Sequence, residues 1–262
     1  MALSPGQPLA EALGLKEPGV VAVAGSGGKT TLLLALAREL AAAGQKVALT
    51  TTTHIYPPPA GLNGEPWMLG RLLPHSHELE LRLRPGRPLV VAGGYTPAGK
   101  LSGLTPEQVE ALARPGLWVL VEADGAARRP LKAWAEWEPA VPPSASWLVV
   151  VAGAAGLGRP LDPAWVHRHQ RFARASGLAL GAPVTPRALA RVLTDPEGPL
   201  RHWPPRRPAL CLLNQTDAIS PRQQDALAAA LSQANQALPP QAPRYRRLLW
   251  GRLRWGRLAP LE

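Results

Sequence analysis

The sequence predicts an α/β fold with a mostly parallel central sheet flanked by helices. Short apolar runs alternate along the chain with segments of helical periodicity, which is typical of such sheets. The runs are rich in Val and Leu and lack polar alternation, so both faces of each strand should be covered by helices. With 262 residues, 46% hydrophobic and 18% charged, the composition is that of a globular chain.

Six apolar runs are the expected strands. They are Val20–Ala24, Val47–Thr51, Leu89–Ala92, Leu117–Val121, Trp147–Ala152 and Ala209–Leu213. The chain shows neither an internal repeat nor a sharp linker, so we expect a single α/β domain over residues 1–262. A glycine-rich segment after the first strand predicts that this domain is P-loop NTPase-like.

Helix start and stop signals place four helices between the strands. Lys29–Ala43 follows a glycine-rich segment and ends before Gly44, a preferred residue after a helix. Thr105 opens a capping box with Pro at the first helical position. Asp162-Pro163 is expected to open a helix to about residue 176, and Ser220-Pro221 one to about residue 234.

The glycine-rich segment has the features of a phosphate-binding loop between a strand and a helix. Its glycines let backbone N–H groups turn inward, and the helix N-terminus adds partial positive charge. Lys29 would reach the β- and γ-phosphates and stabilise charge during transfer, while the Thr30 hydroxyl would bind Mg²⁺. Val23 stands where the full motif has Gly, so the spacing resembles the shortened loop of the Mur ligases. The predicted nucleotide-binding residues are Gly25, Ser26, Gly27, Gly28, Lys29, Thr30 and Thr31.

Polar residues follow other expected strands where they should face this loop. Glu122 and Asp124 end the strand Leu117–Val121, and we predict at least one of them in the magnesium shell and in catalysis. Thr51 ends its strand among a run of threonines and is either a Mg²⁺ ligand or simply a strand former.

A late strand ends in a sequence similar to the base-reading motif of GTPases. Asn214 and Asp217 occupy the positions that would read the base, with Gln215 in place of Lys. The same residue types also suit an ordinary strand-to-helix turn. The expected ligands are therefore Mg²⁺ and either ATP or GTP, and the sequence does not decide between the two bases.

The net charge of +11 is concentrated in the second half of the chain. Residues 1–125 hold 10 basic and 10 acidic side chains, whereas residues 126–262 hold 19 basic and 8 acidic ones. An anionic partner or an Arg-rich coding bias explains this excess equally well. His167, Arg171 and Arg174 fall on one face of the helix expected after Asp162. Second-substrate candidates are Arg128, Lys132, His167 and Arg168.

The basic tail, residues 244–258, is expected to form an edge strand or hairpin. Its six arginines up to residue 257 are interleaved with Tyr245, Trp250 and Trp255, a pattern that could also stack on nucleic-acid bases. Residues 1–15 lack a basic stretch, and the longest apolar run, Trp147–Leu157, is about half of a membrane span. A cytoplasmic protein without membrane contact is the expectation.

Taken together, these motifs resemble the YqeC family, accessory proteins of selenium-dependent molybdenum hydroxylases. The resemblance covers about residues 18–220 and rests on Gly25–Thr31, Thr50–Pro57, Val121–Gly125 with Arg128, Pro130–Lys132, Glu138–Pro142, Val166–Arg168 and Leu213–Asp217. It implies an NTP-binding protein in maturation of a molybdenum hydroxylase or its molybdopterin-type cofactor. Gln215 departs from the Lys of the family. Cys211 lies inside an apolar strand, where a buried structural role is expected rather than a selenium-carrying thiol.

Two other functions compete with an NTP-hydrolysing accessory protein. One is a small-molecule kinase or Mur-like ligase that acts on a phosphorylated acceptor; the other is a nucleic-acid-binding NTPase, which the tail favours less than a hairpin. No residue stands out as a base that activates water, which is typical of a slow or partner-activated NTPase.

Overall fold

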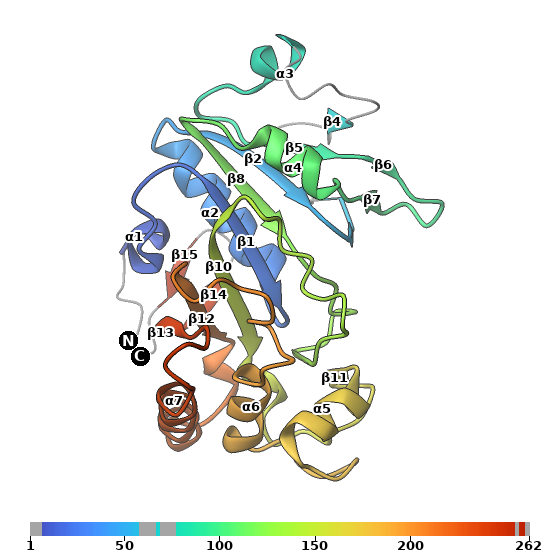
Figure 1. The fold of residues 1–262 in the computed structure, drawn as a ribbon, viewed down its shortest axis with the longest axis vertical. Coiled ribbons are helices and arrows are strands. Elements are labelled where there is room, and N and C mark those ends of the chain that lie inside the picture. Colours follow the sequence, from blue (N-terminus) through green and yellow to red (C-terminus); the bar gives the residue numbers. More distant parts are fainter. Residues whose placement is uncertain (1–6, 58–66, 69–76, 255–256, 260–262) are drawn as a thin grey trace.

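The fold is built on one twisted sheet of eight strands. The computed structural model describes residues 7–57, 67–68, 77–254 and 257–259. The strand order is β13-β12-β10-β1-β8-β2-β5-β4, and each pairing is parallel (Figure 1). The strands are β1 Val20–Gly25, β2 Lys46–Thr51, β4 Trp67–Met68, β5 Leu89–Ala92, β8 Leu117–Glu122, β10 Ala145–Gly153, β12 Ala209–Asn214 and β13 Tyr245–Trp250. The predicted α/β class and the six predicted strands are confirmed.

Three smaller sheets lie beside the central one. β3 (His54–Ile55), β7 (Leu101–Ser102) and β6 (Gly94–Tyr95) form an antiparallel sheet in that order. β9 (Leu131–Lys132) pairs in parallel with β11 (Val166–His167). In the tail, β13 is an edge strand of the central sheet, and β14 (Arg252–Arg254) and β15 (Arg257–Ala259) form a hairpin after it.

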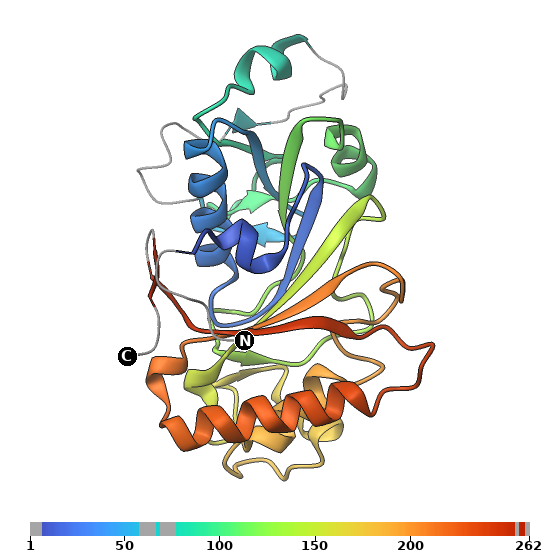
Figure 2. The same cartoon turned by 90° about the vertical axis from the view of Figure 1, so that its left-hand side faces the viewer.

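Helices cover both faces of the central sheet. They are α1 Leu9–Leu13, α2 Lys29–Ala42, α3 His77–Arg82, α4 Pro106–Leu112, α5 His169–Ser176, α6 Pro186–Leu193 and α7 Pro221–Gln236, with short 3-10 turns η1 Ala154–Gly156 and η2 Thr216–Ala218. Figure 2 shows α2 (blue) and α4 (green) on opposite sides of the strands between them. Within the described residues, no helix is long and apolar enough to cross a membrane.

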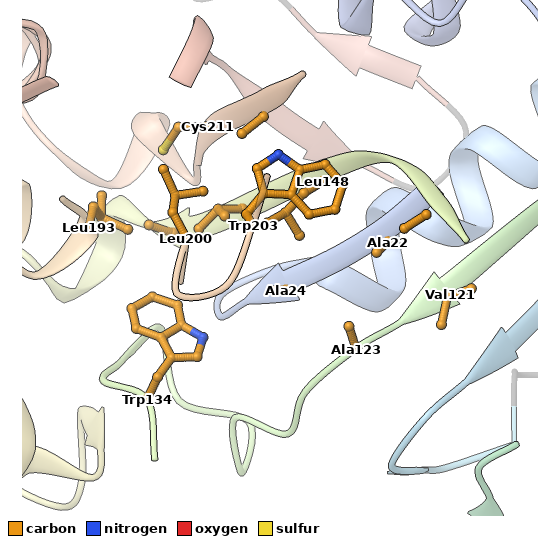
Figure 3. Close-up of a cluster of buried hydrophobic side chains, with 14 of the residues drawn as sticks. Ala22, Ala24, Val121, Ala123, Trp134, Leu148, Leu193, Leu200, Trp203 and Cys211 are labelled. Carbon is orange, nitrogen blue, oxygen red and sulfur yellow. The ribbon is translucent and has the colours of Figure 1, made fainter. Parts of the chain in front are cut away.

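Successive strand residues feed two separate hydrophobic cores, as period-two geometry requires. Val21 and Val23 of β1 pack with α1 and α2, whereas Ala22 and Ala24 pack with the helices on the opposite face. Figure 3 shows the second core, in which Cys211 lies buried. Burial raises the pKa of the Cys211 thiol well above its usual range. The predicted buried position of this cysteine is therefore confirmed.

The helix predicted from Asp162 is wrong at its start. The Asp162 carboxylate accepts hydrogen bonds from the backbone N–H groups of Ala164 (2.8 Å) and Trp165 (3.2 Å), which closes a turn rather than a helix. The chain then adds β11 to β9, and α5 begins only at His169. His167 therefore lies on a strand, and the predicted stripe with Arg171 and Arg174 does not form.

α6 is a helix that the sequence interpretation missed. Thr185 caps it by accepting a hydrogen bond from the N–H of Ala188, with Pro186 at the first helical position. The Thr-Pro pair at its start was the available signal, since the same arrangement opens α4 at Thr105.

Candidate functional site

The glycine-rich loop lies at the carboxyl end of β1, the position where ligands bind in open α/β sheets. Gly25, Gly27 and Gly28 have φ of +102°, +73° and +142°, which side-chain-bearing residues rarely adopt. A Cβ at Gly25 would lie 2.0 Å from the Val151 carbonyl oxygen of the adjacent strand β10. The loop is therefore folded tightly against the sheet, and glycine is required for that approach.

Polar contacts fix the loop from its neighbours. The Ser26 N–H donates to the Val151 carbonyl at 2.8 Å, and the Ser26 hydroxyl donates to the Pro130 carbonyl at 2.9 Å. The Gly25 N–H donates to both carboxylate oxygens of Asp124, at 3.0 and 2.9 Å. These contacts preorganise the loop backbone at the start of α2.

Lys29 joins the loop to the acidic end of β8. Its ammonium donates to the Gly25 carbonyl at 2.7 Å and lies 3.2 Å from Asp124 Oδ1 and 3.7 Å from Glu122 Oε1. The side chain is only 5% exposed, so this positive charge is held in a largely desolvated site. An anion at the loop would compete with the two carboxylates for it.

Thr30, in the first turn of α2, contacts Glu122 at the end of β8. The Thr30 hydroxyl donates to Glu122 Oε2 at 2.8 Å. Burial raises the pKa of the Glu122 carboxyl, although Lys29 and the Thr30 hydrogen bond act in the opposite direction. Hydroxyl and carboxylate oxygens are among the hard oxygen donors that Mg²⁺ prefers. Glu122, rather than Asp124, therefore has the geometry of a magnesium-shell residue.

Asp124 is instead the centre of a buried charge network. Its side chain is fully buried and accepts hydrogen bonds from Lys132 Nζ (2.9 Å) and Trp134 Nε1 (2.7 Å), besides the Gly25 N–H. Burial raises its pKa, but the charges of Lys29 and Lys132 and the Gly25 hydrogen bond outweigh burial and lower it. Asp124 is thus an ionised carboxylate that positions the loop.

The network extends away from the loop through Lys132. The Lys132 ammonium also donates to the Gly125 carbonyl (2.7 Å) and to Glu138 Oε2 (3.2 Å), and Glu138 in turn pairs with Arg168 at 3.0 Å. Lys132 was predicted to lie on the rim of a second-substrate site, but it is buried with its three donor positions used. A buried ammonium with Asp124, Gly125 and Glu138 as its acceptors has the surroundings of a structural cation.

The other second-substrate candidates differ in availability. Arg168 is committed to Glu138 and stacks on the Trp137 ring at 5.5 Å. Burial lowers the pKa of the half-buried His167, and the nearby charges of Lys132 and Arg168 lower it further, so it is neutral near pH 7. Arg128 is exposed and stacks on the Tyr56 ring at 4.5 Å.

Thr51 holds the strand that bears Glu122. Its hydroxyl donates to the Glu122 carbonyl at 2.8 Å and accepts from the Thr53 N–H at 3.0 Å. The structure therefore gives Thr51 a contact that fixes the backbone, and its predicted place as a Mg²⁺ ligand stays a prediction. Thr31 is half-buried in the first turn of α2.

The predicted base-reading residues are held by other parts of the chain. The Asn214 amide donates to the Gly27 carbonyl at 2.7 Å and accepts from the Leu253 N–H at 2.8 Å. The Asp217 carboxylate pairs with Arg252 at 3.1 Å. Asn214 thus ties the glycine loop to the C-terminal hairpin, while Asp217 sits beside the same hairpin.

The described aromatic residues of the tail do not form a shared surface on which nucleic-acid bases could stack. Tyr245 is 3% exposed, and its hydroxyl donates to the Leu193 carbonyl at 2.8 Å in the core. Trp250 is half-buried, and Trp255 lies outside the described residues. In the part of the tail that the structure describes, β13 is an edge strand of the central sheet and β14 and β15 form a separate hairpin.

Comparison with known proteins gives one family. The family model described as "YqeC protein" matches residues 21–170. The "Uncharacterized protein YqeC" of Escherichia coli (strain K12) is 36% identical over 195 residues, which cover 72% of this chain and 73% of the relative. The matched family range contains the glycine loop and the whole charge network from Lys29 to Arg168, but ends before β12.

Proposed function

This chain belongs to the YqeC family, and we propose that it binds and hydrolyses a nucleoside triphosphate with Mg²⁺. The family resemblance predicted from the motifs is confirmed. The proposed chemistry is inferred from the residues of the site. The observation that carries the proposal is the Thr30–Glu122 hydrogen bond of 2.8 Å beside the buried Lys29 and the glycine loop. A role as accessory protein in maturation of a selenium-dependent molybdenum hydroxylase or its cofactor is the cellular setting that the resemblance supports.

Each side chain of the site has a distinct task in this proposal. The loop N–H groups and Lys29 bind the phosphates, and Lys29 stabilises charge that develops on the transferring phosphoryl group. Thr30 and Glu122 would hold Mg²⁺ directly or through its water shell. The metal, when bound, neutralises charge on the β- and γ-phosphates. Asp124 keeps the loop and Lys29 in place without touching the nucleotide.

Calorimetric titration with ATP, GTP and CTP, each with and without Mg²⁺, tests the proposal directly. We expect binding of at least one triphosphate that is at least tenfold tighter with Mg²⁺. Phosphate release assays on the same samples then measure hydrolysis. Absence of binding for all three nucleotides would refute the proposal.

Glu122→Gln is expected to separate metal handling from folding. The amide keeps the size of the side chain and can still accept from Thr30, but it lacks the charge that binds Mg²⁺. Hydrolysis should fall at least about tenfold, and the Mg²⁺ concentration for half-maximal activity should rise about tenfold. Glu110→Gln, which changes an exposed carboxylate on α4, is the matched control. An unchanged Mg²⁺ requirement would assign the metal to other residues.

Base selectivity is expected to be weak. Asn214 is bound at both ends of its amide, and Asp217 is paired with Arg252, so neither is free to read guanine without losing a partner. ATP and GTP should bind within about threefold of each other, and Asp217→Ala should change that ratio by less than about twofold. A tenfold loss of GTP preference in Asp217→Ala, absent in the exposed control Asp225→Ala, would instead show that Asp217 reads the base.

A further inference from the structure

A short loop after β8 is held at both ends by the glycine loop. It spans residues 125–129. Before it, Asp124 accepts from the Gly25 N–H, and after it, the Pro130 carbonyl accepts from the Ser26 hydroxyl. Since consecutive Cα atoms are about 3.8 Å apart, the Cα of Arg128 lies within about 8 Å of that of Pro130. The backbone at Arg128 is therefore held near the glycine loop.

The backbone of this loop is strained where Arg128 stands. Ala127 and Arg128 have φ of +46° and +59°, two consecutive left-handed residues that are not glycine. Such conformations cost about 1–3 kcal/mol each and persist where the surroundings require them, often at ligand sites. The loop thus presents the exposed Arg128 side chain at an energetic cost.

A second cation converges on the same point from the small antiparallel sheet. Ile55 of β3 pairs with Leu101 of β7, so the next residues outward, Tyr56 and Lys100, stand opposite each other. Lys100 Nζ lies 5.1 Å and Arg128 Cζ 4.5 Å from the centre of the Tyr56 ring, which is 52% exposed. Figure 1 shows β7 and the chain that follows β8 on the same side of the molecule.

These two cations differ from the other cations around the site. Lys132, Arg168 and Arg171 each have a carboxylate partner within 3.2 Å. In the part of the chain that the structure describes, Arg128 and Lys100 have only the Tyr56 ring between them and no carboxylate. Two like charges held near one exposed ring repel each other, so an anion bound beside the ring, within reach of both cations, would be favoured.

We propose that Arg128, Lys100 and Tyr56 form the binding site for the phosphate group of a second, small-molecule ligand. Two converging cations complement a phosphomonoester, which carries close to two negative charges at pH 7, and Arg matches its oxygens with a planar fork. Arg128 lies two residues before Pro130, whose carbonyl accepts from Ser26 of the glycine loop, so a phosphate group bound by Arg128 would lie on the rim of the proposed nucleotide site. This inference rests on the proposed nucleotide function and names the chemical class of a second ligand of the same protein.

Phosphorus NMR titration with inorganic phosphate tests the site, with the glycine loop saturated by Mg²⁺ and a non-hydrolysable triphosphate. We expect millimolar binding that weakens at least about fivefold in Arg128→Gln and in Lys100→Gln. Triphosphate affinity should stay within about twofold in both variants. Arg129→Gln is the matched control, because it removes the same charge from the same loop at a side chain that is committed to the Pro163 carbonyl. Its phosphate affinity should be unchanged.

Other results would overturn the inference. Phosphate binding that is equal in Arg128→Gln and the wild type would remove Arg128 from the site. A fivefold loss of triphosphate affinity in that variant, without phosphate binding to the loaded wild type, would place Arg128 on the nucleotide instead. Tighter binding of succinate than of phosphate would contradict the phosphate assignment. If no triphosphate binds at all, the proposed function fails, while titration of the free variants still tests the cation pair.

Discussion

Lys29→Ala is expected to abolish measurable binding of Mg²⁺-triphosphate. The ammonium is 5% exposed and lies at the junction of the glycine loop with Glu122 and Asp124, so its charge acts in a desolvated site. Removing one partner of a desolvated charge pair, here the Lys29 ammonium that would face a phosphate, typically costs about 2–5 kcal/mol of binding free energy. This corresponds to a loss of affinity of about 30-fold to more than 1,000-fold. Calorimetric titration with the triphosphate that binds best to the wild type measures this loss.

A fall in stability has to be separated from this loss of binding. Lys29→Ala also removes a counter-charge from two buried carboxylates, so its melting temperature should be determined without nucleotide. Lys16→Ala, at an exposed position before β1, is the matched control and should bind as the wild type does. A folded Lys29→Ala protein that retains nucleotide affinity would contradict the assignment of the glycine loop.

The central sheet and the loop were predictable because their signals are local. A continuous apolar run such as Val20–Ala24 specifies a buried parallel strand, and a Thr105 or Ser220 capping box specifies where a helix starts. The register between strands then brings the end of β8 to the end of β1, with Val23 opposite Glu122. Proximity of the acidic residues to the glycine loop thus followed from topology alone.

The distribution of roles among those residues was not predictable, because it depends on contacts distant in sequence. Glu122 and Asp124 were equivalent candidates, and only their partners, Thr30 in one case and Lys132 with Trp134 in the other, distinguish them. Trp134 was not among the predicted site residues, and Glu138 appeared only within a segment of the family resemblance. The role of an indole N–H or a carboxylate in a hydrogen-bond network can be recognised only when the fold shows which buried charge it contacts.

The helix predicted from Asp162 failed for a related reason. The Asp-Pro signal is shared by helix starts and turns, and the pairing of Val166 with Leu131 decided between them. That pairing also brings His167 beside Lys132, which helps to keep the imidazole neutral. A strand of two residues has too short a pattern to be recognised before its partner is known.

Asp124→Asn is expected to lower the free energy of unfolding by about 3–5 kcal/mol, the usual cost of breaking a buried ion pair. Lys132 would keep only Glu138 as a counter-charge in a fully buried position, and the new amide N–H₂ would face the donors Gly25 N–H and Trp134 Nε1–H. Urea denaturation at pH 7 measures the change. Glu122→Gln, two residues earlier, is the matched comparison and should cost far less, because burial already disfavours its charged form.

Lys132→Met tests whether the loss comes from the pair itself. If Asp124 and Lys132 act together, the double variant Asp124→Asn/Lys132→Met should lose less stability than the sum of the two single losses, by about 1–3 kcal/mol. Additive losses would show that each side chain is stabilised by its other partners. Preserved stability in Asp124→Asn would return Asp124 to the group of exchangeable metal ligands.

The ionisation of Asp124 predicts how the difference in unfolding free energy between the wild type and Asp124→Asn depends on pH. The pKa of Asp124 is lower in the folded protein than its ordinary value of 3.8, so the unfolded chain takes up the proton first as the pH falls. The stabilisation by Asp124 is therefore complete above about pH 4 and is lost as the pH falls through the lowered folded pKa. The raised pKa of Glu122 has the opposite sign and is caused by burial and in part by the Asp124 charge, so the comparison should be made between proteins that both carry Glu122→Gln. The gap in unfolding free energy should thus be constant from pH 5 to 7 and narrow below pH 4, whereas a gap independent of pH would mean that Asp124 is not ionised in the fold.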